Sequence, residues 1–327
     1  MSKDGMRIRT VCGDINADDF GFCQSHEHLT IRKGRSAEIN PALCIDDLQK
    51  TEVDLKQYKE AGGDAVIDAQ PVGCGRDTRD LVKLSENSGV HILASTGFHR
   101  LCFYPEDHWI RDFETDRLAG VFAEELLTGT YTDCDHAPPK TRSRAKAGQI
   151  KTALEKDWGE LQEKLFTAAA SAAMATGAPM MVHTEKGSDP EGLLSFLEAK
   201  GVSADRVIFC HMDRMIPDIS VHKRIADKGS YLEYDTIARP KAHSDETELG
   251  IVREMMDAGY ESRLLMSLDV TRNRLAGYGS DIGLSYLIVK FLPLMRANGI
   301  AEEQIGKIFR SNPQTAFALR KGRTGLT

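Results

Sequence analysis

Short apolar segments alternate with longer amphipathic segments along most of the chain. Most of the amphipathic segments end in glycine, which favours the left-handed conformation that closes helices. A short β segment, residues 6–13, precedes the first unit. Repetition of strand and helix eight times predicts an α/β fold, a (β/α)8 TIM barrel formed by a single domain over residues 1–327. The predicted strands, which read as buried on both faces, are residues 20–25, 64–69, 90–96, 147–153, 179–184, 206–211, 230–235 and 263–269.

An open, doubly wound sheet is the alternative fold. Such sheets usually have fewer units, and no GxGxxG sequence follows the first predicted strand. In a barrel, the long loop at residues 98–112 follows the third strand and lies on the C-terminal face, where active sites sit. The long loop at residues 129–146 precedes the fourth strand, so we expect it on the opposite face, with a role in solubility or stability.

Composition narrows the class of protein. The chain has 327 residues, 41% hydrophobic and 28% charged, as in soluble proteins with a large core. A net charge of -7 argues against a general nucleic-acid binder. No apolar leader begins the chain, and the hydrophobic segment 284–295 is interrupted by Lys290 and Pro293, so we expect no membrane insertion. Seven cysteines without CxxC spacing fit reduced thiols in the cytoplasm, and a homodimer is expected because homodimers are common.

Residues with metal-binding side chains stand at the C-terminal ends of five predicted strands. His26 and His28 are two positions apart and therefore point to the same side of the first strand, with Glu27 on the other. A barrel brings strand ends together around one axis, and imidazole and carboxylate ligands suit zinc or a similar divalent ion. A lone histidine at a strand end is more often a packed core residue, but six candidates on one rim favour a metal site. The remaining four candidates are Lys151, His183, His211 and Asp269.

Several motifs, taken in this order, resemble the phosphotriesterase family of the amidohydrolase superfamily. The resemblance covers nearly the whole chain. Its motifs are SHEH at 25–28, VGCGRD at 72–77, AGQIK at 147–151, CHMDR at 210–214 and RSNPQTAF at 310–317.

The resemblance implies a binuclear metal centre. His26, His28 and Asp269 would hold one divalent ion, and His183 and His211 the other. Burial lowers the pKa of a lysine and exposes a neutral amine, and the resemblance implies that Lys151 carries an N6-carboxyl group that bridges both ions together with a hydroxide. Zinc is the expected metal, and manganese or cobalt also suits these ligands. The hydroxide would attack an ester carbon or phosphorus, while Asp269 takes up its proton.

Basic residues follow the seventh and eighth strands, where barrels commonly bind phosphate. Lys241 and Arg272 match positions that hold the substrate phosphate in the family branch acting on phosphorylated sugar lactones. This chain has Leu275 where that branch has a tyrosine, and Tyr278 is the candidate substitute. Arg239 is a further substrate-binding candidate.

Arg274, by contrast, is expected to be a solvated charge of the loop. Other positions depart from two other branches of the family. The proton-relay aspartate and histidine of the organophosphate enzymes are replaced by Arg214 and Thr236. The tyrosine that quorum-signal lactonases carry after the third strand is replaced by His99. These differences argue against organophosphates and acyl-homoserine lactones as native substrates. His99 is instead a candidate for binding substrate hydroxyl groups, with packing inside an ordered loop as the alternative.

The first hypothesis is therefore a metal-dependent hydrolase, a lactonase that opens phosphorylated sugar lactones. A phosphoesterase acting on a cyclic sugar phosphate or an organophosphate triester is the enzymatic alternative. A metal-containing binding protein without turnover is an alternative from a different class. Asp269 argues against that class, because a purely structural site has no need of an open metal pair that carries water.

Overall fold

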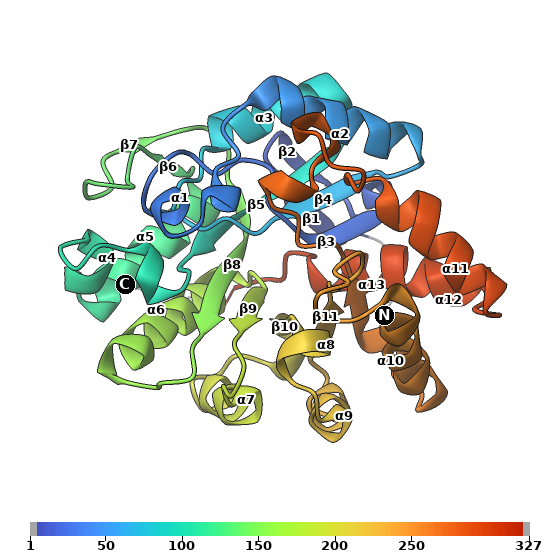
Figure 1. Ribbon diagram of the computed structural model, residues 1–327. Coiled ribbons are helices and arrows are strands. Elements are labelled where there is room, and N and C mark those ends of the chain that lie inside the picture. Colours follow the sequence, from blue (N-terminus) through green and yellow to red (C-terminus); the bar gives the residue numbers. More distant parts are fainter. Residues whose placement is uncertain (1–4, 323–327) are drawn as a thin grey trace.

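The eight apolar segments predicted as strands form one parallel sheet (Figure 1). The computed structural model of the protein describes residues 5–322. The hydrogen-bonded order of the sheet is β3-β4-β5-β8-β9-β10-β11-β12, and β12 lies beside β3, so that the sheet curls into a barrel. The predicted (β/α)8 barrel is confirmed. The strands are β3 (Cys23–Glu27), β4 (Ala65–Asp68), β5 (His91–Gly97), β8 (Ala147–Leu154), β9 (Met180–Thr184), β10 (Val207–Cys210), β11 (Tyr231–Tyr234) and β12 (Leu264–Met266).

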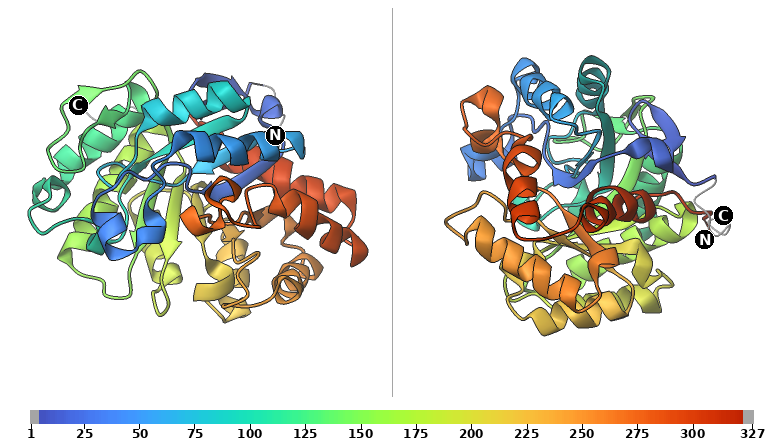
Figure 2. Two further views of the ribbon diagram at one scale, coloured as in Figure 1. Left: turned by 45° about the horizontal axis from the view of Figure 1, so that its top comes forward. Right: turned by 90° about the vertical axis from the view of Figure 1, so that its right-hand side faces the viewer.

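Helices surround these strands on the outside, as both views in Figure 2 show. Several begin at an aspartate or serine whose side chain accepts a hydrogen bond from a backbone N–H of the first turn, as Asp77 does for α3. Among residues 5–322, no helix has the length and apolar character needed to cross a lipid bilayer. The helices are α1 (Arg35–Ile39), α2 (Leu48–Glu60), α3 (Thr78–Ser88), α4 (Trp109–Asp112), α5 (Thr115–Leu127), α6 (Glu160–Thr176), α7 (Pro190–Ala199), α8 (Met212–Met215), α9 (Ile219–Asp227), α10 (Asp245–Asp257), α11 (Leu292–Ala297), α12 (Glu302–Gly306) and α13 (Asn312–Ala316).

Burial on both faces explains the short apolar strands. Every residue of β4, β10, β11 and β12 is buried. One set of side chains fills the barrel interior, including Ile67, Met181 and Ile208. A larger set packs between the strands and the helices. The inner set closes the barrel below the C-terminal ends of the strands, so the polar residues at those ends stand on a packed apolar floor.

The side chain of Glu27 joins the two edges of the barrel. Its carboxylate oxygens accept hydrogen bonds from the backbone N–H groups of Leu268 and Val270, each at 2.8 Å. The backbone N–H of Asp269, between them, donates to the carbonyl of His26 at 3.1 Å. Burial raises the pKa of Glu27 to about 8, although these two N–H groups favour its ionised form. Glu27 thus points away from the histidines beside it, as predicted, and fixes β3 against the segment after β12.

The predicted placement of residues 129–146 on the opposite face was wrong. This segment contains the antiparallel pair β6 (Tyr131–Thr132) and β7 (Thr141–Arg142). Between these strands, Asp135 accepts a hydrogen bond from the backbone N–H of Gly75, which follows β4. The segment therefore runs back along the outside of the barrel and packs on loops of the C-terminal side. A second hairpin, β1 (Arg7–Thr10) with β2 (Gly13–Asn16), begins the described chain and confirms the predicted N-terminal β segment.

The sequence predicts two short separate helices near the C-terminal end, at residues 301–312 and 313–320, and this prediction is wrong. From Glu302 to Ala316 the chain is continuously helical, with a π-helical turn at Lys307–Ser311 between α12 and α13. Pro313 is the second residue of α13 and follows the π-helical turn after one intervening residue. A second π-helical turn, Leu287–Phe291, stands in the same relation to Pro293 in α11. Wider turns of this kind let a helix continue past a proline.

A buried ion pair stabilises the loop after β4. Arg76 and Glu125 are joined by two hydrogen bonds of 2.6 and 2.8 Å, and Arg76 also donates to the carbonyls of Ser95 and Tyr131. Arg76→Met leaves Glu125 buried without its partner, which costs about 3–5 kcal/mol in the free energy of unfolding. Urea denaturation measures the loss.

The control is Arg224→Met, which removes the exposed Arg224–Glu191 pair. It should cost less than about 1 kcal/mol because water screens exposed pairs. Equal losses in the two variants would contradict the role assigned to the buried pair.

Candidate metal centre

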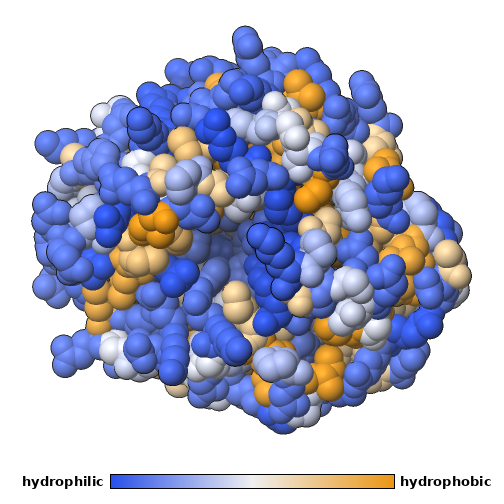
Figure 3. Space-filling view, in the orientation of Figure 1, coloured by the Kyte–Doolittle hydropathy of each residue, from blue (hydrophilic) through white to orange (hydrophobic). Residues whose placement is uncertain are grey.

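The structure brings all six predicted metal ligands together at the C-terminal ends of the strands. We call these six residues the paired centre. His26 lies within the barrel strand β3, Lys151 within β8, and His183 within β9. Lys151, His26 and His211 are at most 1% exposed. In Figure 3 the surface is hollowed near the middle of the view, with hydrophilic residues around the hollow. The paired centre consists of His26, His28, Lys151, His183, His211 and Asp269.

One group of donors in the paired centre surrounds Asp269. Its Oδ1 lies 3.7 Å from His26 Nε2 and 3.6 Å from His28 Nε2. Lys151 Nζ lies 3.3 Å from the same nitrogen of His26. His26, His28 and Asp269 thus converge from β3 and the residue after it, and from the segment after β12, and convergent donors of this kind suit a single cation.

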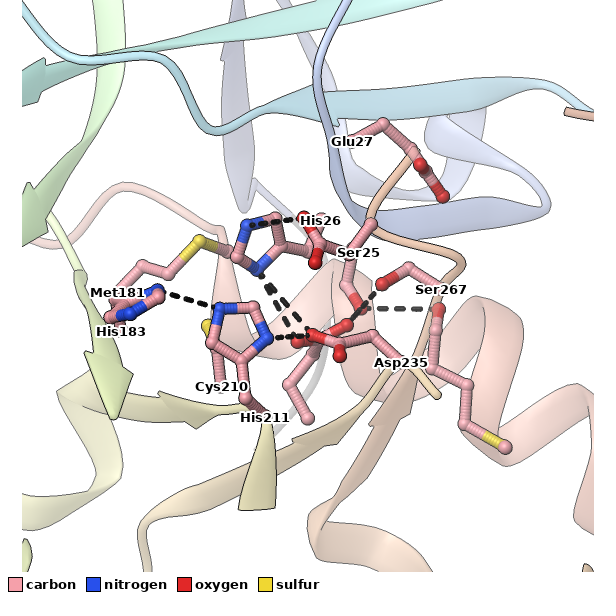
Figure 4. Close-up of polar contacts among 12 residues, drawn as sticks. Ser25, His26, Glu27, Met181, His183, Cys210, His211, Asp235 and Ser267 are labelled. Carbon is pink, nitrogen blue, oxygen red and sulfur yellow. Dashed lines mark hydrogen bonds and ion pairs between the residues drawn. The ribbon is translucent and has the colours of Figure 1, made fainter. Parts of the chain in front are cut away.

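The other group consists of His183 and His211. His183 Nδ1 and His211 Nε2 face each other at 2.8 Å. Their rings are 4.5 Å apart between centroids, and the ring of His26 lies 4.8 Å from that of His211. Figure 4 shows the three imidazoles close to one another, whereas Glu27 points away from them. The two groups are therefore neighbours.

Burial disfavours the charged forms of the nitrogen donors of the paired centre. It lowers the pKa of Lys151 below the usual lysine value and that of His28 to about 4. It also lowers the pKa of His26, His183 and His211. Among residues 5–322, no carboxylate forms an ion pair with Lys151. Neutral imidazoles and a neutral amine are the forms that bind a metal or take up carbon dioxide.

Two of the ligands sit on strained backbone just past a strand. His211 has φ of +62° and Asp269 has φ of +50°, values that side-chain-bearing residues rarely adopt. The predicted eighth strand ran to residue 269, but β12 ends at Met266. Residues 263–269 were predicted as a strand because most of them are apolar. The chain turns after Met266 because Glu27 binds the N–H groups on either side of Asp269.

The sequence analysis missed two carboxylates, Glu233 of β11 and Asp235, which directly follows β11. Asp235 Oδ2 accepts a hydrogen bond from His211 Nδ1 at 2.6 Å. Glu233 Oε2 lies 3.4 Å from His26 Nδ1. Such partners orient metal-binding histidines and increase their basicity. The alternation of the sequence LEYD at 232–235 was the available signal, because residues 233 and 235 share one face of the strand.

Two guanidinium groups hold the remaining oxygen of Asp269. Arg214 Nη2 and Arg239 Nη2 each donate to Asp269 Oδ2 at 2.8 Å. Burial alone would raise the pKa of Asp269, but the charges of Arg239 and Arg214 lower it below its usual value. Arg214 also forms an ion pair with Asp235, and its Nη2 lies 2.7 Å from His211 Nδ1. Arg214, noted from the sequence only as a departure, thus contacts the paired centre directly.

The donors of the paired centre suit divalent cations. His26, His28 and Asp269 form one set of convergent atoms. His183 and His211 face each other beside this set. A further set joins His26 and His211 to the two carboxylates Glu233 and Asp235, which lie outside the paired centre. Imidazole and carboxylate donors suit zinc, manganese or cobalt. Lys151, which is buried beside His26 and forms no ion pair with a carboxylate within residues 5–322, is chemically suited to carboxylation.

The predicted phosphate-binding residues lie in the loops after β11 and β12. Lys241 is exposed and has no hydrogen-bond or ion-pair partner within residues 5–322. Arg272 lies over the ring of Tyr278 at 4.9 Å and near Asp46. The hydroxyl of Tyr278 is bonded to the backbone N–H and carbonyl of Asp47 at 2.8 and 3.2 Å. Tyr278 therefore positions Arg272 through its ring. Its hydroxyl group binds the backbone of Asp47, the residue that precedes α2.

The expectation of a solvated Arg274 is wrong. Arg274 is 7% exposed and donates to the carbonyls of Leu268, Asp269 and Ile237. These acceptors come together only in the folded protein, which explains why the local sequence suggested an exposed charge. Arg274 braces the turn that carries Asp269.

His99 is buried next to the paired centre. Its ring lies 5.2 Å from the ring of His183 and 4.8 Å from that of Phe103. Its Nδ1 accepts a hydrogen bond from the backbone N–H of Arg100 at 2.8 Å. The loop after β5 is thus ordered, with a short 3-10 helix at Leu101–Phe103 and with α4.

Comparisons with known proteins agree with this geometry. The model of the phosphotriesterase family matches residues 6–317. A phospho-furanose lactonase of Mycoplasmopsis synoviae is 27% identical over 96% of this chain and 92% of its own. An N-acetyltaurine hydrolase of Tetraodon nigroviridis is 27% identical over 96% of this chain and 98% of its own. The crystal structure of a lactonase from Listeria monocytogenes is 26% identical, with a TM-score of 0.87 over 96% of this chain and all of that one.

Asp235→Asn tests the role of the carboxylate beside His211. We expect metal affinity to fall by about 10–100-fold, because the neutral amide holds the imidazole less firmly and makes it less basic. Competition with a chromogenic chelator measures the affinity. The control is Thr236→Val, since Thr236 contacts Arg214 through its hydroxyl but touches no histidine. Unchanged affinity in Asp235→Asn would show that Asp235 does not support the centre.

Proposed function

The chain belongs to the phosphotriesterase family, and on this premise we propose that it is a metal-dependent lactonase that opens phosphorylated sugar lactones. The observation that carries the proposal is the convergence of six donors, four of them buried, beside two basic loops. The similarity to a phospho-furanose lactonase over nearly the whole chain supports the choice of substrate.

The paired centre would bring water and the lactone carbonyl together. His26, His28 and Asp269 would hold one ion, His183 and His211 the other, and carboxylated Lys151 both. Two divalent cations supply an acidified water and a polarised carbonyl group. The guanidinium groups of Arg214 and Arg239 keep Asp269 ionised, which is the form that accepts a proton. Asp269 would take the proton of the attacking water and deliver it to the leaving ring oxygen.

The phosphate would bind at the outer side of the site. Lys241 is exposed and unpaired, and Arg272 is held by Tyr278 and Asp46 at the start of the neighbouring loop. An ammonium and a guanidinium group suit a phosphate monoester, and neither has to leave a strong buried partner to bind it. His99 would contact sugar hydroxyl groups from the side of His183.

The metal, the cellular location and the assembly are proposed from the sequence. We take zinc as the metal because imidazole and carboxylate donors suit it. All seven cysteines are free thiols, which fits a cytoplasmic enzyme. A homodimer remains the expected assembly.

A panel of sugar lactones, each with and without a terminal phosphate, tests the substrate. We expect kcat/KM to be about 10–100-fold higher for the phosphorylated member, since charge-assisted hydrogen bonds contribute about 1.5–3 kcal/mol. Lys241→Ala and Arg272→Ala should remove most of this preference, whereas Lys83→Ala on α3 should keep it. Cyclic sugar phosphates and N-acetyltaurine complete the panel. Equal rates for each lactone pair would remove the anion pocket, and faster turnover of either added compound would replace the lactone as substrate.

Asp269→Asn separates metal binding from proton transfer. We expect the variant to keep most of its metal through the histidines and to lose about 10²–10⁴-fold in kcat, because an amide cannot take up the proton. Metal content and lactone hydrolysis are measured on the same sample. The matched control is Asp281→Asn, an exposed carboxylate of the same loop region. Unchanged turnover in Asp269→Asn would refute the role given to Asp269.

A further inference from the structure

A second cluster of metal-binding side chains lies outside the paired centre. Asp213 comes from α8, Glu248 from α10, and His243 from the loop that joins β11 to α10. One oxygen of each carboxylate and one nitrogen of the imidazole all lie within 4.8 Å of one another. None of these residues is a ligand in the paired centre, and three separate segments of the chain converge on this point.

The cluster is buried, and one of its donor atoms has no partner. Glu248 is 0% exposed and Asp213 is 6% exposed. Glu248 Oε2 is bonded to His243 Nε2 at 2.6 Å. Glu248 Oε1 is buried and has no hydrogen-bond donor within the described residues. A buried carboxylate oxygen without a partner is costly, and a cation at this point would remove that cost.

No basic side chain neutralises the two carboxylates. Within residues 5–322, no lysine or arginine forms an ion pair with Asp213 or Glu248, and His243 is the single cationic candidate. The guanidinium group of the adjacent Arg214 is already paired with Asp235 and Asp269. Burial and the neighbouring Asp213 raise the pKa of Glu248 well above its usual value. The two acidic groups therefore favour a bound positive charge between them, either a proton or a cation.

The backbone holds Asp213 in the orientation that a ligand requires. Its Oδ2 accepts hydrogen bonds from the backbone N–H groups of Asp235 and Thr236 at 2.8 and 2.6 Å. Its Oδ1 accepts one from the N–H of Arg214 at 2.9 Å. Three bonds leave one of about four lone-pair positions of a carboxylate free. Carboxylates that ligate metals are commonly fixed by hydrogen bonds in this way.

We propose that Asp213, His243 and Glu248 bind a third divalent cation, of the zinc or manganese class, in addition to the two ions of the paired centre. Two carboxylates and one imidazole are a donor set that these ions accept. The side chain of His243 is 15% exposed, which leaves a path for the ion and a place for water to complete its coordination. The ion would join α8 to α10 and to the loop that carries Arg239, independently of the reaction at the paired centre.

Metal counting tests the proposal on the full-length protein. Metal-free protein is loaded with zinc, passed through a desalting column, and analysed by inductively coupled plasma mass spectrometry. We expect three ions per chain in the unaltered protein and two in the double variant His243→Gln/Glu248→Gln. The control is Glu254→Gln, which changes an exposed carboxylate on the same helix and should retain three.

A thermal titration keeps the test decisive if the double variant folds poorly. An ion that binds only the folded protein raises the melting temperature by mass action. The unaltered protein, already loaded with two ions, should show a further rise as zinc is added, and His243→Gln alone should lose that rise. Saturation at two ions per chain, or three ions in the double variant, would overturn the proposal and would show that the cluster holds only a proton. Neither result bears on hydrolysis at the paired centre.

Discussion

The contact between β3 and the segment after β12 is the constraint on which the paired centre depends. Seven neighbouring strand pairs are joined by backbone ladders, but this junction is joined by the carboxylate of Glu27 together with the backbone hydrogen bond from Asp269 to His26. By binding the N–H groups of Leu268 and Val270, Glu27 forces the turn that places Asp269 opposite His26 and His28. The residues of the HEH sequence, His26, Glu27 and His28, therefore have two different roles. Its histidines face the metal site, and the residue between them closes the barrel that brings Asp269 to the site.

The sequence was sufficient where periodicity and burial decide the structure. All eight strands and the convergence of the six ligands follow from apolar segments with polar ends, because parallel strands in a barrel present those ends on one rim. It was insufficient where contacts link separate loops. Arg274 looks like a loop charge until the carbonyls of Leu268 and Ile237 are brought to it. The direction of residues 129–146 depends in the same way on Asp135 meeting Gly75.

The charges of Arg214 and Arg239 favour the ionised form of Asp269, although its surroundings shield most of its side chain from water. Arg214 and Arg239 approach Oδ2 and leave Oδ1 facing the histidines. One oxygen is thus reserved for the metal side and the other for the protein. Asp235 extends the arrangement, since it contacts both Arg214 and His211. The hydrogen bonds around the histidines and those around Asp269 form one network, so a change in the loop after β10 reaches both halves of the paired centre.

The same structure separates the parts that are fixed from the parts that can vary. The predicted metal ligands stand at or next to strand ends, where backbone pairing and a packed floor hold them. The residues proposed to bind the substrate phosphate stand in loops, and Lys241 has no hydrogen-bond or ion-pair partner within residues 5–322. Loops of this kind tolerate substitution because few buried contacts depend on them. The hydrolytic chemistry can therefore persist while the bound substrate changes, which is consistent with relatives of this chain being named as lactonases and as N-acetyltaurine hydrolases.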